Sequence, residues 1–232
     1  MNDWFSWNGV RCTQYGIRVT GFPNITLPAE RSTFTSIPGR SGNLVTLEDE
    51  DIYDDVLLTC TCCATSMTYL DAIAAYLKGS GTVTFANRPG GFYYARIVNQ
   101  IPFSRIVRGN PQHEFTVVFH CKPFFYLTPG ADITLTESGT FLTNPGCIAS
   151  EPVITIAGTG DITLMVGQQI IELEDVTTGI VLDSELQEAY LGDTSLNNLM
   201  TGDFPKFPTG AFAVSWTGSV SNVTIRPNWR TL

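Results

Sequence analysis

The chain is 232 residues long, 43% of it hydrophobic, with 22 acidic residues, 13 Lys or Arg residues and a formal net charge of −9 at pH 7. This composition is typical of a folded globular protein, and the length suits one large β domain or two domains of about a hundred residues each. The acidic balance argues against sequence-specific binding of nucleic acid through a basic face. Because the N-terminus lacks a signal-like apolar run and no stretch of about eighteen apolar residues occurs, we expect neither secretion nor membrane insertion.

Six cysteines are present, and three of them form the pattern C-x-C-C at Cys60, Cys62 and Cys63. A structural zinc site needs two well-separated pairs of ligands, which this spacing does not provide. The period of two along a strand places Cys60 and Cys62 on one face and Cys63 on the other. We therefore expect reduced thiols in a β core, and neither a metal nor a cofactor.

The first part of the chain predicts β structure. Residues 4–7 lead into an Asn-Gly turn, and residues 15–19 alternate like a second strand. Residues 21–43 contain too many Gly and Pro residues for a long regular element. Residues 44–63 predict two strands that pair across a charged tip. The tip carries an acidic cluster, which comprises Glu48, Asp49, Glu50 and Asp51.

One helix is expected, over residues 66–78, with a Ser that can cap its start, apolar residues at three-to-four spacing and a Gly after its end. It should pack against a sheet. Strands follow at residues 82–85 and 92–98, and then over 112–121, where apolar and polar residues alternate as in a half-buried strand.

Residues 124–152 are rich in turn-forming residues and are interpreted as the seam between two β domains. The expected organisation is a ring-forming domain over residues 1–128, a connecting segment over 129–145 with a short strand at 133–136, and a β-sandwich over 146–232. The sandwich should consist of short strands separated by glycine-containing turns, at residues 153–156, 162–166, 169–173, 179–182, 211–216 and 220–226.

No catalytic site is predicted. The sequence lacks the motifs of serine hydrolases, zinc proteases and phosphate-binding loops, and its only two histidines lie on opposite faces of one predicted strand. Two carboxylate pairs could hydrolyse glycosides if they faced each other across a bond, but surface charges on strands are far commoner. These pairs are Glu172 with Glu174 and Asp183 with Glu185.

Exposed aromatic residues would open a different class of function, carbohydrate binding by the second domain. Trp216 and Trp229 could stack on sugar faces, as tryptophans do in carbohydrate-binding modules. Trp216 alternates with Phe212 and Val214, which indicates that it faces the core. The pattern around Trp229, which follows Pro227, does not place its side chain. A carbohydrate-binding protein is therefore the alternative function.

An ordered series of short motifs runs through nearly the whole chain. The first half has FSWNGVRCTQYGIRV, IPGRSG, an acidic strand ending in a Leu-rich stretch, a single helix, TFANRPGGFYYARI and FTVVFHCKPFFY. The second half has NPG, EPVITIAGTGDITLMVG, IVLDSE and GDFPKFPTGAFAVSWTGSVSNVTIRPNWRTL. In this order the motifs resemble the phage distal tail protein (Dit) family of long non-contractile tails. The chain departs from that family in residues 211–213, where Asn is common, and in its cluster of cysteines.

The resemblance implies a mainly β fold, with a tail-tube-like β-sandwich and one flanking α-helix followed by a galectin-like β-sandwich. It implies a structural virion protein without catalysis that forms a homo-hexameric ring, a baseplate hub at the distal end of the phage tail, assembled in the host cytoplasm. Its partners would be the tail tube protein, a tail tip or tail-associated protein, and a receptor-binding protein.

The resemblance also places an extended arm, which clasps the neighbouring subunit, in residues 34–58. The acidic cluster in this segment would repel DNA if it lined the lumen of the ring, because like charges repel across a short distance in water. The residues expected at the ring interface or in the arm are Phe34, Ile37, Pro38, Arg40, Leu47, Ile52 and Tyr53.

Overall fold

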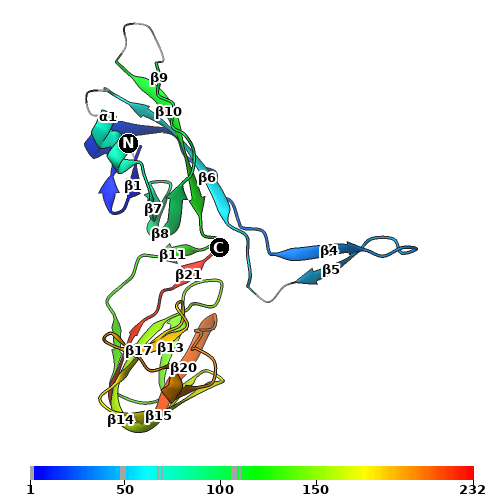
Figure 1. Ribbon diagram of the computed structural model, residues 1–232, viewed down its shortest axis with the longest axis vertical. Coiled ribbons are helices and arrows are strands. Elements are labelled where there is room, and N and C mark those ends of the chain that lie inside the picture. The colour runs from blue at the N-terminus through cyan, green and yellow to red at the C-terminus, as the bar shows by residue number, and fades with distance from the viewer. Residues whose placement is uncertain (1–2, 48–50, 67, 69, 106–108, 110) are drawn as a thin grey trace. The chain divides into compact units, whose positions relative to one another are not determined.

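A computed structural model of the chain describes residues 3–47, 51–66, 68, 70–105, 109 and 111–232. The chain divides into two compact units, the first formed by Met1–Phe125 together with Leu232 and the second by Tyr126–Thr231. Strands dominate both units, and α1 (Leu70–Tyr76) is the one α-helix among the described residues (Figure 1). The prediction of a mainly β fold with one helix is therefore confirmed, although the described helix is shorter than the expected 66–78.

The first unit is organised around one sheet of short and medium-length strands. These are β1 (Phe5–Trp7), β2 (Val10–Arg11), β3 (Ile17–Gly21), β6 (Val56–Ala64), β7 (Ser80–Phe85), β8 (Arg88–Ile97), β9 (Ser104–Arg105) and β10 (His113–Cys121). A 3-10 turn, η1 (Cys12–Tyr15), precedes β3. The strand order is β2-β1-β7-β8-β10-β6-β3, with β9 beside β10. The longest pairing joins β10 to β6, antiparallel from His113 opposite Ala64 to Cys121 opposite Val56.

The core of the first unit lies on one face of this sheet, because alternate residues of each strand are buried. Phe119 of β10 is at its centre, with ring centroids 5.4 Å from Phe5, 5.5 Å from Trp7 and 5.5 Å from Phe85. Helix α1 covers the same face through Tyr76, whose ring stacks on Phe5 at 6.2 Å. The expected packing of a helix against a sheet is thus confirmed.

The thiols of the first unit follow the predicted strand geometry. Cys60 and Cys62 are buried on the inner face with their Sγ atoms 3.7 Å apart, whereas Cys63 is half-buried, and all six cysteines are free. Burial disfavours the charged thiolate. It raises the pKa of Cys12 to about 11 and that of Cys121 to about 12.

These environments predict how the thiols react. At pH 8 a disulfide reagent in excess should modify Cys147 quickly, because this side chain is exposed, and Cys63 slowly, because partial burial raises its pKa. The other four thiols should react only after unfolding, since all four side chains are buried and out of reach of the reagent. Absorbance kinetics with Cys147→Ser as the control measure this directly. Fast modification of a third thiol would contradict the described core.

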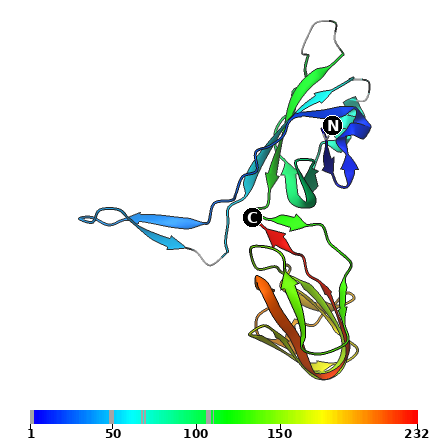
Figure 2. The ribbon, with the colours of Figure 1, turned by 180° about the vertical axis from the view of Figure 1, so that it is seen from behind.

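A two-stranded hairpin formed by β4 (Ser32–Ser36) and β5 (Asn43–Leu47) stands apart from the sheet of the first unit (Figures 1 and 2). The prediction that residues 44–63 pair as two strands across a charged tip is wrong. Strand β5 pairs with β4, and β6 pairs with β10 and β3. Glycine and proline in residues 21–43 had argued against a long element, yet the five-residue strand β4 fits between them.

The second unit is a β-sandwich. The strands of the sandwich are β12 (Ile133–Leu135), β13 (Thr140–Asn144), β14 (Val153–Val166), β15 (Gln169–Val176), β16 (Ile180–Asp183), β17 (Glu188–Leu191), β18 (Thr194–Ser195), β19 (Met200–Thr201) and β20 (Gly210–Arg226). Two further strands, β11 (Phe125–Leu127) and β21 (Arg230–Thr231), pair with each other outside the sandwich, and the first residue of β11 belongs to the first unit. A 3-10 turn, η2 (Asn197–Leu199), precedes β19. The main strand order is β12-β20-β14-β16-β17-β18, with β13 beside β20, β15 beside β14 and β19 beside β15.

Two long strands, β14 and β20, pair with each other along most of their length, and β14 also pairs with β16 in its first part and with β15 in its second. The expected strands 153–156 and 162–166 are one strand, as are 211–216 and 220–226, and the predicted turns between them are bends with register shifts. Gly218 makes the bend in β20 possible, with φ 97°, because a Cβ there would lie 2.3 Å from the carbonyl oxygen of Asp161. The sandwich prediction holds, but the number of separate strands was wrong.

The observed boundaries differ from the expected ones. The segment 129–145 was expected to connect two domains, but it supplies β12 and β13, which pair with β20 inside the second unit. The division falls in β11, which pairs with β21 at the other end of the unit.

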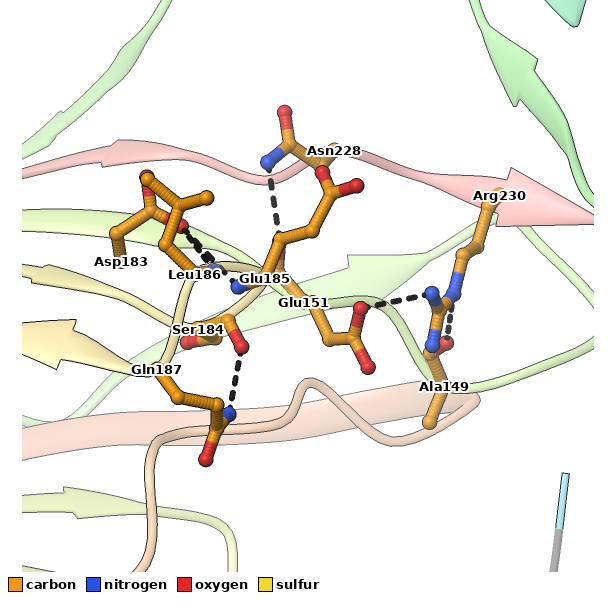
Figure 3. A network of polar contacts seen from close by, with 9 residues as sticks. All are labelled: Ala149, Glu151, Asp183, Ser184, Glu185, Leu186, Gln187, Asn228 and Arg230. Atoms are coloured by element: carbon orange, nitrogen blue, oxygen red, sulfur yellow. Dashed lines mark hydrogen bonds and ion pairs between the residues drawn. The ribbon is translucent and has the colours of Figure 1, made fainter. Parts of the chain in front are cut away.

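A buried ion pair fixes the last strand of the second unit (Figure 3). The guanidinium of Arg230 donates from Nη1 to Glu151 Oε2 at 2.9 Å and from Nε to the carbonyl of Ala149 at 2.8 Å. The side-chain amide of Asn228 donates to the carbonyl of Glu151 at 2.9 Å. Strand β21 is thereby tied to the segment before β14.

The two units differ sharply in charge. Residues 1–125 contain ten Lys or Arg and ten Asp or Glu residues, whereas residues 126–232 contain three and twelve. The whole formal charge of −9 therefore belongs to the second unit.

Candidate functional site: the exposed β4–β5 hairpin

The β4–β5 hairpin presents apolar side chains on both of its faces. Its register places Phe34 opposite Val45 and Thr35 opposite Leu44. Since opposite residues share a face, Phe34 and Val45 form an apolar pair on one side, and Leu44 lies among threonines on the other. At the turn, the backbone N–H of Arg40 donates to the carbonyl of Ile37 at 3.1 Å.

At the base of the hairpin the two chain segments pair again, antiparallel, with Glu30 opposite Tyr53. The N–H of Arg31 donates to the carbonyl of Ile52 at 2.9 Å, and the N–H of Asp54 donates to the carbonyl of Ala29 at 2.9 Å. Arg31 Nε also bonds Asp54 Oδ1 at 3.0 Å, across the two chain segments. Tyr53 packs edge-on against Phe124, with ring centroids 5.8 Å apart. The hairpin is therefore held in a defined way at its root.

The exposure of this hairpin is unusual for a water-soluble surface. Phe34 is 64% exposed and Val45 is 52% exposed, and two further apolar side chains that precede the hairpin, Ile25 and Leu27, are also exposed. Covering a Val or Phe side chain completely stabilises a complex by about 1.5–3 kcal/mol. Each strand also has one edge that no described strand pairs with, which another chain could extend. The arrangement suits an arm that another protein surface covers.

Of the residues expected in the arm, some lie in the β4–β5 hairpin and others at its root. Phe34 lies in β4, with Ile37, Pro38 and Arg40 in the turn that follows, and Leu47 ends β5. Ile52 and Tyr53 lie at the root, where both are half-buried. The expected range 34–58 also takes in the start of β6, whose Val56 and Leu58 belong to the core of the sheet.

The acidic cluster can be placed only in part. Glu48, Asp49 and Glu50 lie outside the described residues, while Asp51 is exposed in a turn with φ 61°. Sequence reasoning also missed Val45 and Leu44 as surface residues. The apolar and β-branched residues of 43–47 indicated a strand, but the wrong strand partner was assigned to it.

The two carboxylate pairs lie in different settings. Glu172 and Glu174 line one open depression on the surface of the second unit. Asp183 Oδ1 accepts the backbone N–H groups of Glu185 and Leu186 at 3.1 and 3.0 Å, which is the role of a turn residue (Figure 3). Among the described residues, no group of three or more His, Cys, Asp or Glu side chains is placed to hold a metal ion. No described helix is long and apolar enough to cross a bilayer.

Neither tryptophan of the second unit provides a platform for stacking on sugars. Trp216 is buried in the sandwich core, as its alternation predicted. Trp229 packs on Phe207 and Phe212, with ring centroids 5.7 and 6.5 Å apart, and is half-buried. The alternative function thus lacks the aromatic residues that suggested it.

Comparison with known proteins finds a similar fold but no similar sequence. The sequence matches no protein-family model and no curated protein. Among solved structures, the chain is similar to the Dit protein (gp 19.1) of phage SPP1, with a TM-score of 0.74, 14% sequence identity, and 96% of each chain covered. That protein is described as a paradigm of the hub adsorption apparatus in phages that infect Gram-positive bacteria. Over nearly its whole length, this chain has the fold of a phage distal tail protein.

Proposed function

We propose that the chain is a structural phage tail protein, a distal tail subunit that assembles into a hexameric ring hub. The observation that carries the proposal is the apolar, rooted and solvent-exposed β4–β5 hairpin in a chain whose fold is that of a Dit protein. A subunit that clasps its neighbour through an arm has to expose that arm when it is alone. The neighbour in the ring would cover Phe34 and Val45.

In this role the ring joins the tail tube to the tail tip and carries the host-recognition apparatus at the distal end of the virion, after assembly in the host cytoplasm. The subunit has no catalytic task. Because the charges of the first unit balance, a repulsive lumen would depend on the local acidic cluster at residues 48–51 and not on the charge of the unit as a whole. Reversal of these four charges should then impair DNA ejection while rings still form.

The ring prediction is tested with substitutions on one face of the hairpin. The wild-type chain should sediment as a ring of about 150 kDa, six copies of a 25.4 kDa chain. The double variant Phe34→Ser and Val45→Ser should sediment as a monomer with an unchanged circular dichroism spectrum, since both side chains are exposed in the single chain.

A matched control alters the opposite face of the same hairpin, in which Thr33 pairs with Thr46. The variant Thr33→Ser and Thr46→Ser should keep the ring. Rings that survive loss of Phe34 and Val45 would show that the hairpin is not the clasp. A wild-type chain that stays monomeric at high concentration and in purified tails would contradict the hexamer itself.

A further inference from the structure

The outer face of the second unit carries an apolar row, which comprises Phe141, Ala213, Met165 and Ile170. Phe141 of β13 lies opposite Ala213 of β20, and Met165 of β14 lies opposite Ile170 of β15. Met165 also lies opposite Ser215, two residues along β20 from Ala213, so the row crosses four neighbouring strands. Phe141 is 76% exposed and Ile170 is 58% exposed. Two large apolar side chains therefore stand in solvent on the same sheet face.

An acidic depression adjoins this row, lined by Asp161, Glu172, Glu174 and Asp175. It is open, about 300 Å³ in volume, and Glu172 lies opposite Thr163 on the strand pair that carries the apolar row. The backbone N–H of Asp175 donates to Asp161 Oδ1 at 3.1 Å, which orients that carboxylate. Within the described part of the chain, no basic side chain forms an ion pair with Glu172 or Glu174. The depression thus offers uncompensated negative charge beside apolar surface.

Charge decides what kind of surface can cover this face. The second unit of another copy would bring a further formal charge of −9 against the first, and an anionic membrane or polysaccharide would meet the same repulsion. A protein that presents Lys or Arg around an apolar anchor meets attraction on the acidic depression and buries the apolar row.

We propose that the apolar row and the acidic depression together form a docking surface for a different protein with a basic contact surface. The apolar row is the buried centre of that interface, and the carboxylates receive the basic side chains at its rim. The inference rests on the proposed function, because the partner is then another protein of the same virion. It concerns a surface separate from the β4–β5 hairpin, which the ring neighbour covers.

Site-specific photo-crosslinking tests the docking surface in assembled virions. The full chain carries p-benzoylphenylalanine at position 141 or 170, or at the control position 186, where Leu186 is an exposed apolar residue outside the row. Positions 141 and 170 should each crosslink to the same second virion protein, through a peptide that contains Lys or Arg. Position 186 should not crosslink to that protein.

The outcomes separate the two proposals. If purified particles contain the chain but positions 141 and 170 crosslink only to further copies, or to nothing, the docking surface is refuted while the tail assignment stands. If the particles lack the chain, the proposed function fails and this inference fails with it.

A charge reversal adds a second readout at the same surface. Glu172→Lys should lower the crosslink yield from position 141 by about tenfold, because it places a cation where the partner's basic side chains bind. The matched control Asp193→Lys makes the same change in net charge at an exposed residue of the same unit that does not line the depression. Equal yields from the two variants would show that the carboxylate at 172 is not part of the interface.

Discussion

Replacing Phe119 by Ala should destabilise the first unit by about 3–5 kcal/mol, which is the usual cost of removing a buried aromatic ring from a core. The side chain is fully buried, and its ring contacts Phe5 and Trp7 of β1 and Phe85 of β7. The cavity would remain because the three neighbouring rings are held on two paired strands, β1 and β7, and cannot all move inward. Chemical denaturation followed by tryptophan fluorescence measures the loss, since Trp7 touches the ring that is removed.

The matched control is Phe34→Ala in the same unit, where the side chain is 64% exposed in the isolated chain. Its free energy of unfolding should stay within about 0.5 kcal/mol of the wild type, provided that the protein is studied as a monomer. An equal loss in both variants would mean that Phe34 is packed in the chain and is not available to a neighbour.

Replacing Arg230 by Met should destabilise the second unit by about 3–5 kcal/mol, because it leaves the partly buried carboxylate of Glu151 without its partner. The Arg230 side chain is 9% exposed and also loses its bond to the carbonyl of Ala149. Thermal and chemical unfolding of the purified variant give the loss. The double variant Arg230→Met and Glu151→Gln should recover part of the stability, since the uncompensated charge is gone.

A second pair in the same unit provides the control for this prediction. Arg226 Nε lies 3.4 Å from Asp132 Oδ1, but the Arg226 side chain is 59% exposed. Arg226→Met should therefore cost only about 0–1 kcal/mol, as is usual for ion pairs in water. We attribute the larger loss of unfolding free energy at position 230 to the burial of its ion pair. Similar losses at positions 226 and 230 would refute this explanation.

The sequence predicted those parts of the fold that depend on how apolar residues are spaced along a single strand or helix. The alternation in β10 and the burial of Trp216 both follow from which face of an element meets the core, whereas the apolar spacing in α1 was right for Ile73 but not for Leu70, which is exposed. The long strands β14 and β20 could not be predicted in this way. Glycines that end a strand and glycines that let a strand bend give the same local signal, and only pairing with distant strands tells them apart.

The candidate site was predicted from a resemblance and only partly from residues. Phe34 and the turn after it were placed in an arm, but the partner of residues 44–47 was assigned to the segment that follows them, not to the one before. Pairing between strands is a tertiary property, so an alternating segment indicates a strand without naming its neighbour. The docking surface on the second unit has no motif at all, because Phe141, Met165 and Ile170 come from three separate strands.

The pairing of β11 with β21 has a consequence for how such a chain could change during evolution. Because the chain enters and leaves the second unit through two paired strands, the two ends of this unit lie close together, as in an inserted module. Insertions whose ends lie close together can be exchanged for other folded modules with little strain on the host. The sandwich can therefore diversify, or be replaced, while the part that carries the β4–β5 hairpin is conserved in shape.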